Sequence, residues 1–76
     1  MTDKNYCVYK YLISYIKENG YPPSYMEIGE ALNIVHSVVL KHLKKLEKEG
    51  WIELRPKSPR AIKIIGYKFV FDTFLL

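Results

Sequence analysis

Residues 24–50, SYMEIGEALNIVHSVVLKHLKKLEKEG, are the stretch that decides the fold. Ser24 and Glu27 form the S-x-x-E pattern of a capping box, which predicts that a helix begins directly after Ser24. Asn33 tolerates the left-handed backbone conformation, so it suits the end of that helix. A second helix is predicted after a very short turn, and it ends at Gly50, the residue type preferred just beyond a helix C-terminus. Two helices joined in this way indicate a helix-turn-helix.

The second of these helices has an apolar face and a basic face. The apolar face, at positions i, i+4 and i+7, consists of Val39, Leu43 and Leu46. At 100° per residue, the opposite side carries Ser37, Lys41, Lys44 and Lys48, flanked by Lys45 and Val38. No acid occurs in residues 31–46, and lysines near the positive end of a helix dipole are better placed beside phosphates than in water. The alternative is a solvated face with surface ion pairs, Lys44–Glu47 and Lys45–Glu49.

Length and charge describe one small basic domain. Its 76 residues are 49% hydrophobic, and a chain of this size buries roughly 60% of its unfolded surface. Residues 1–30 hold three lysines and four acids, net −1, whereas residues 31–76 hold nine basic and four acidic residues, net +5. This segregation favours a polyanionic partner. We see neither an apolar run of membrane-spanning length nor a signal peptide, and the single Cys7 fits a reducing cytoplasm.

A further helix is predicted before the helix-turn-helix. Thr2 or Asp3 caps it, Gly20 ends it, and its apolar stripe consists of Tyr9, Leu12, Ile13 and Ile16. His36 and His42 have no cysteine or histidine partner at ligand spacing, so no metal site is predicted. We expect His42 to lie at the rim of the core and to make a hydrogen bond.

A hairpin is predicted after the helix-turn-helix. Residues 51–55 and 60–64 alternate as strands do, and the proline-bounded residues 56–59 form the turn between them. Basic side chains gather at its tip: Arg55, Lys57 and Arg60. Such a tip suits phosphates or a narrow minor groove, although a turn can also be polar for no other reason than exposure.

Several blocks of the sequence occur in an order and spacing that resemble a known family. They are Gly20-Tyr21-Pro22-Pro23-Ser24, Glu27-Ile28-Gly29-Glu30-Ala31, His42-Leu43, Leu46-Glu47, Gly50 and Pro59-Arg60-Ala61-Ile62. Together they are similar to the DNA-binding domain of LexA repressors over residues 5–65. The resemblance implies a three-helix winged helix-turn-helix whose third helix enters the major groove of an operator.

Three departures from the family pattern matter. The turn and helix entry, residues 33–38, are one residue shorter. The polar start of the family's recognition helix is replaced by Val35, His36, Ser37, Val38 and Val39, so its base-reading residues are not carried over. No Ala-Gly cleavage site or Ser/Lys pair follows the hairpin, and we therefore expect neither a protease domain nor self-cleavage.

The C-terminal residues 67–76 are strongly apolar, and their composition fits a strand or a short terminal helix equally well. We predict that this tail closes a homodimer, because one helix-turn-helix reads only a few base pairs. The residues that would form the contact are Phe69, Phe71, Phe74, Leu75 and Leu76. The alternative is a lid that packs back across the first helix of the same chain.

The predicted protein is α+β and mostly α, with a winged helix-turn-helix in residues 1–65 and an apolar tail in residues 66–76. We expect a cytoplasmic, nucleoid-associated regulator of a bacterium or its phage, a repressor that binds double-stranded DNA without a cofactor or enzymatic activity. We assign contacts with base edges to Ser37, Val38 and Lys41, and contacts with phosphates to Lys44, Lys45 and Lys48. The flanking backbone is assigned to Arg55, Lys57 and Arg60. The alternative function is a protein-interaction module that modulates a full-length repressor, which the apolar residues Val35, Val38 and Leu40 favour.

Overall fold

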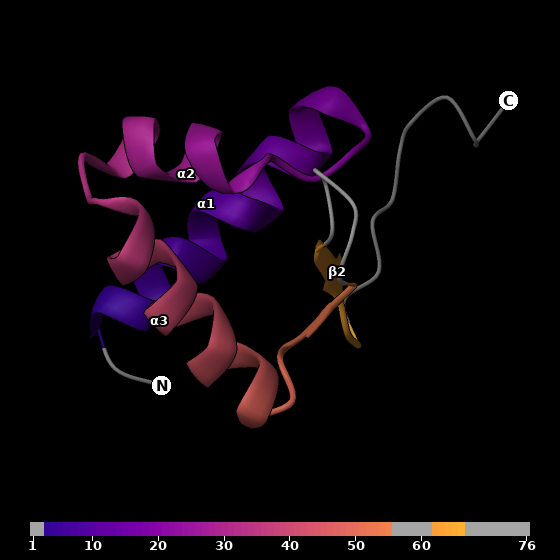
Figure 1. The fold of residues 1–76 in the computed structure, drawn as a ribbon. Coiled ribbons are helices and arrows are strands. Elements are labelled where there is room, and N and C mark those ends of the chain that lie inside the picture. The colour runs from indigo at the N-terminus through magenta and orange to yellow at the C-terminus, as the bar shows by residue number, and fades with distance from the viewer. Residues whose placement is uncertain (1–2, 56–61, 67–76) are drawn as a thin grey trace, which may run out of the picture.

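The computed structural model describes residues 3–55 and 62–66, and this part of the chain forms three helices and a two-stranded antiparallel hairpin (Figure 1). In chain order the elements are α1 (Asp3–Asn19), α2 (Tyr25–Leu32), α3 (His36–Lys48), β1 (Ile52–Leu54) and β2 (Ile62–Ile64). The predicted fold class is thereby confirmed. The tail of residues 67–76 and the hairpin tip of residues 56–61 lie outside the described residues, so the predicted division after residue 65 stays a prediction.

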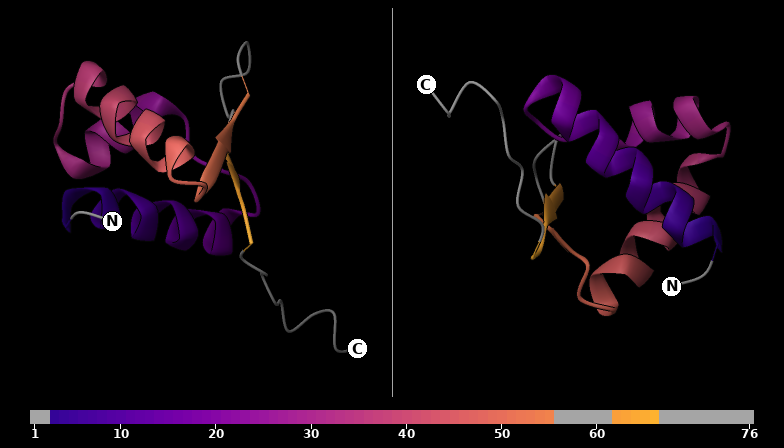
Figure 2. Two further views of the ribbon diagram at one scale, coloured as in Figure 1. Left: turned by 90° about the horizontal axis from the view of Figure 1, so that it is seen from below. Right: turned by 180° about the vertical axis from the view of Figure 1, so that it is seen from behind.

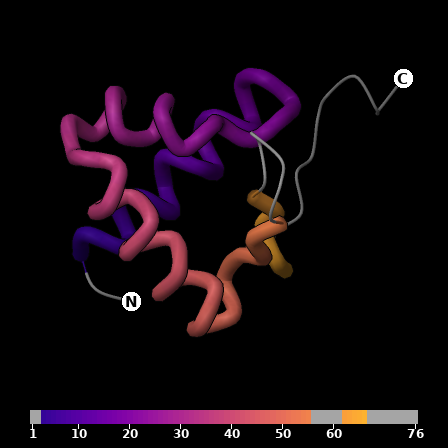
Figure 3. The backbone as a smooth tube through the Cα atoms, in the orientation of Figure 1, coloured from indigo at the N-terminus to yellow at the C-terminus, as the bar shows by residue number. Residues whose placement is uncertain are grey.

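The ends of α1 and α2 follow the capping signals in the sequence. In the capping box, the Glu27 N–H donates to Ser24 Oγ at 3.2 Å and the Ser24 N–H donates to Glu27 Oε1 at 2.8 Å. Asn33 ends α2 in the left-handed conformation, with φ 56° and ψ 49°, and Gly20 follows α1 with φ 81°. Because Asn33 reverses the chain within one residue, the connection from α2 to α3 is short (Figure 3).

The hairpin lies beside the C-terminal end of α3 (Figure 2). In its register Ile52 faces Ile64, and Leu54 faces Ile62. The predicted first strand began at Trp51, but the Trp51 N–H donates back to Leu46 O of α3 at 3.0 Å, and β1 begins at Ile52. The observed strand is therefore shorter than the predicted residues 51–55.

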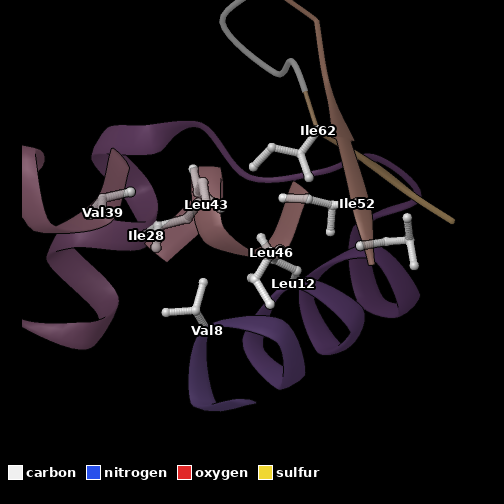
Figure 4. Packing of buried hydrophobic residues seen from close by; sticks show 9 residues of the cluster. Val8, Leu12, Ile28, Val39, Leu43, Leu46, Ile52 and Ile62 are labelled. Carbon is white, nitrogen blue, oxygen red and sulfur yellow. The ribbon is translucent and has the colours of Figure 1, made fainter. Parts of the chain in front are cut away.

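One apolar core holds the helices and the hairpin together (Figure 4). Its buried members come from every element of the described structure: Val8, Leu12, Ile28, Val39, Leu43, Leu46, Ile52, Ile62 and Ile64. The predicted apolar face of α3 is confirmed, since its three residues are fully buried. On α1, Leu12 is buried and the rest of the predicted stripe packs half-buried around the core.

Two contacts at the core edge orient α1. The Tyr15 hydroxyl donates to Glu27 Oε2 at 3.1 Å, which connects α1 to the capping box of α2. The Tyr9 ring meets the Trp51 ring edge-on, with centroids 5.6 Å apart, which connects α1 to the start of the hairpin. None of the helices described here is both long and apolar enough to cross a membrane.

Candidate nucleic-acid interface

The turn between α2 and α3 depends on a glycine. The Ile34 N–H donates to Gly29 O at 3.0 Å, which folds the turn back onto α2. A Cβ atom at Gly29 would lie 2.9 Å from Ile34 O, closer than side chains come to a backbone oxygen. Gly29 therefore permits the close approach that places α3 across α2.

The exposed face of α3 carries the residues that the sequence assigns to DNA. Ser37 and the helix's lysines, Lys41, Lys44, Lys45 and Lys48, are exposed, whereas Val38 is half-buried. Within residues 3–55 and 62–66, no ion pair joins these lysines to a carboxylate. The surface pairs Lys44–Glu47 and Lys45–Glu49, which the alternative of a solvated face included, are therefore not formed among the described residues, although the exposure of the lysines fits that alternative as well.

The N-terminus of α3 lacks a side-chain cap. Val35 is its N-cap residue, with φ −75° and ψ 159°, and its side chain accepts no hydrogen bond. Val35 is also 66% exposed. No acid lies in the first turn, so the positive end of the helix dipole is not offset by a carboxylate. Exposed His36, whose ring lies 6.1 Å from the Tyr25 ring, adds a polar group at this end.

His42 connects α3 to α1 through a buried partner. Its Nδ1 lies 2.5 Å from Oδ1 of Asn5, a carbonyl-type oxygen that only accepts, so the ring nitrogen is the donor. This bond confirms the predicted role of His42 at the core rim. Burial lowers the pKa of His42, and the positive charges of Lys4, Lys41 and Lys45 lower the pKa further.

Lys4 is a cation of this surface that the sequence analysis missed. Its charge acts on His42 across the α1–α3 contact, so the N-terminal turn of α1 adds to the positive potential beside α3. The available signal was helical spacing, since exposed Lys4 precedes buried Val8 by four residues and so lies on the same side of α1 as Val8, at the helix end.

The hairpin is anchored to α3 by an acid. The Leu54 N–H donates to Glu47 Oε2 of α3 at 3.0 Å. Within the hairpin, the Ile65 N–H donates to Trp51 O at 3.0 Å, one pair beyond Ile52 and Ile64. Arg55, directly after β1, is exposed. The other two predicted backbone-contacting residues, Lys57 and Arg60, lie outside the described residues.

The exposed polar groups of this surface are mostly cations. In the described part of the chain, no group of three histidine, cysteine or acidic side chains is arranged to hold a metal ion. The surface offers instead exposed cations on a helix whose opposite face is fixed in the core. Ammonium groups of this kind neutralise phosphates, and the end of such a helix fits the major groove.

Comparison with known proteins gives one consistent family. Residues 1–61 match the family described as "LexA DNA binding domain". The chain is 46% identical over 66 residues to the LexA repressor of Shouchella clausii, which covers 86% of this chain and 32% of that protein. It is 48% identical over 67 residues to the LexA repressor of Listeria welshimeri, which covers 87% of this chain and 33% of that protein. It is 41% identical over 67 residues to the LexA repressor of Staphylococcus aureus, which covers 87% of this chain and 32% of that protein. The chain thus spans about a third of the length of the curated relatives it matches.

Proposed function

The chain belongs to the family of LexA DNA-binding domains, and from this premise we propose that it is a transcriptional repressor that binds double-stranded DNA sequence-specifically. The observation that supports this function most directly is the division of α3. Three of its residues are buried, while the side chains on its exposed face are basic and form no ion pair within residues 3–55 and 62–66. A helix so fixed by its own core presents its cations to a groove without rearrangement.

The proposed contacts follow from position along α3. N-terminal residues of a recognition helix approach the bases first, so Ser37, Val38 and Lys41 face base edges. Lys44, Lys45 and Lys48, farther along the helix, face phosphates. Arg55, together with Lys57 and Arg60 of the hairpin, holds the flanking backbone.

The repressor acts, in this proposal, as a homodimer in the cytoplasm. One helix-turn-helix covers too few base pairs to select a site in a genome, and pairing doubles the length read. The proposed pairing element is the C-terminal tail with Phe69, Phe71, Phe74, Leu75 and Leu76. Sedimentation of the full chain and of a chain ending at Gly66 tests this, because pairing through the tail predicts a dimer and a monomer, respectively. If the full chain also sediments as a monomer, pairing through the tail is contradicted.

The decisive experiment for DNA binding is a salt titration on a duplex selected by the full chain from a random pool. Each phosphate contact contributes about 0.9 to the slope of log K against log salt. The variant Lys44→Gln/Lys48→Gln should flatten the slope by about 2 and weaken selected and random duplexes alike. Lys41→Ala should instead weaken the selected duplex by roughly 1–3 kcal/mol and the random one much less.

The matched control is Lys10→Gln/Lys17→Gln, which removes the same charge from exposed positions on α1. Under the proposal it leaves the slope nearly unchanged. Equal effects of the two double variants would mean that net charge alone attracts DNA, and the α3 interface would be rejected. Absence of any salt-dependent binding would favour the protein-interaction alternative.

A further inference from the structure

The N-cap residue of α3 is not one of the residue types that helix N-cap positions favour. N-cap positions favour Ser, Thr, Asp or Asn, because their oxygen accepts a hydrogen bond from the first turn. This chain follows the rule at α2, where Ser24 is the cap, and departs from it at α3, where the cap is Val35. At 66% exposure, Val35 gains little from burial in its own core. Its side chain therefore serves neither the helix end nor the core.

A second valine continues the same edge of the helix. Val38 follows Val35 by three residues, and its N–H donates to Val35 O at 3.0 Å, so the two residues lie one turn apart at the start of α3. Val38 is half-buried and lines an open groove between α1 and α3, together with Leu32 and Ile34. Three residues after Val38 comes exposed Lys41, which the proposed function places against DNA. The apolar pair thus lies within the proposed DNA interface, directly before its first lysine.

We propose that Val35 and Val38 select thymine by contacting its C5-methyl group in the major groove. Among the base edges exposed in that groove, the thymine methyl is the apolar group, and the others are hydrogen-bond donors and acceptors. Valine has neither donors nor acceptors, so a polar base edge against it loses its bound water without compensation. This inference rests on the proposed function, and it adds the chemical feature of the operator that the first turn of α3 recognises.

The charges around the pair favour DNA over an apolar protein surface. Lys41, Lys44 and Lys45 follow on the same helix, and its first turn contains no acid. A protein surface that covered the valines would bring these cations into a low-dielectric interface without partners. DNA offers a methyl group and phosphates within one groove, so it matches both parts of the surface.

The test replaces thymine by deoxyuridine, which lacks only the C5-methyl group. The full chain first selects a duplex from a random pool, and each thymine of that duplex is then replaced in turn. Loss of one buried methyl group predicts roughly fourfold weaker binding at one or two positions and no change at the other thymines. The Val35→Ala variant should bind the thymine duplex about fourfold more weakly and lose its sensitivity to deoxyuridine at one of those positions.

Tyr6→Ala is the matched control. Tyr6 is 50% exposed and lies with Lys10 and Lys17 on a face of α1 other than the one that lines the groove beside Val38. This variant should keep the full sensitivity to deoxyuridine. If the chain binds its selected duplex and every deoxyuridine copy equally well, the methyl contact is refuted while the proposed function stands. If no duplex is selected at all, both fail together. If deoxyuridine weakens binding equally in wild type and Val35→Ala, Val35 is not the contacting residue and the inference is wrong for it.

Discussion

A serine at position 35 should stabilise the protein. Val35 and Ser24 occupy the same capping position with nearly the same backbone, φ −75° and ψ 159° against φ −76° and ψ 164°. At Ser24 the side chain accepts the N–H of the third residue on, Glu27, at 3.2 Å. The Val35→Ser change introduces an oxygen on a similar backbone, where it can accept the Val38 N–H that now donates to Val35 O at 3.0 Å, and such a cap contributes about 1 kcal/mol. For a domain of this size, that corresponds to a rise in Tm of about 4–8 °C.

Thermal and urea unfolding, followed by circular dichroism, measure this gain. The control is Val35→Ala, which removes the exposed apolar side chain without supplying an oxygen, so the difference between the two variants isolates the cap. The increase in the free energy of unfolding comes from a hydrogen bond within the first turn of α3, so it should be measurable in the absence of DNA. Equal unfolding midpoints for the serine and alanine variants would show that the first turn of α3 gains nothing from a cap, and the comparison with Ser24 would be refuted.

Three further outcomes follow from contacts within the described residues. Gly29→Ala should lower the free energy of unfolding by about 1–3 kcal/mol, because its Cβ would lie 2.9 Å from Ile34 O; unchanged urea unfolding would mean that the turn relaxes freely. The contribution of neutral His42 to the free energy of unfolding should be fully present above its ordinary pKa of 6.5 and fall as the pH drops through the lowered folded-state pKa, because the unfolded chain binds the proton more readily. Urea unfolding midpoints should lose this pH dependence in the His42→Gln variant. A dependence that persists in this variant would assign it to other groups. Glu47→Ala should speed hydrogen exchange at the Leu54 amide, whose acceptor it removes, and unchanged exchange would show that the anchor does not hold the hairpin.

Local signals in the sequence predict the helices well because their determinants lie within a few residues of one another. The capping box, Asn33 and Gly50 each act on the chain next to them, and the structure has all three in the predicted conformations. The apolar face of α3 was predictable for the same reason, since its spacing alone puts Val39, Leu43 and Leu46 on one side.

Contacts between distant parts of the chain were not accessible in this way. The bond between His42 and Asn5 joins residues 37 positions apart, and no local pattern identifies Asn5 as its acceptor. The influence of Lys4 on α3 depends on how α1 crosses α3, which the sequence periodicity leaves open. The hairpin's first strand was predicted to begin at Trp51, but the helix end at Gly50 directs the Trp51 N–H to Leu46 O, so only the Trp51 carbonyl is left to pair with Ile65.

The anchoring of the hairpin to α3 also determines how the protein can vary its binding site. Glu47 and the backbone of Leu46 hold the hairpin, and neither belongs to the residues proposed to contact bases. Substitutions at Ser37 or Lys41 therefore remove none of the contacts that hold the hairpin against α3. Under the proposed function, a protein of this kind should acquire new target sequences through single substitutions on α3, because the contact that positions the hairpin is not among the residues that change.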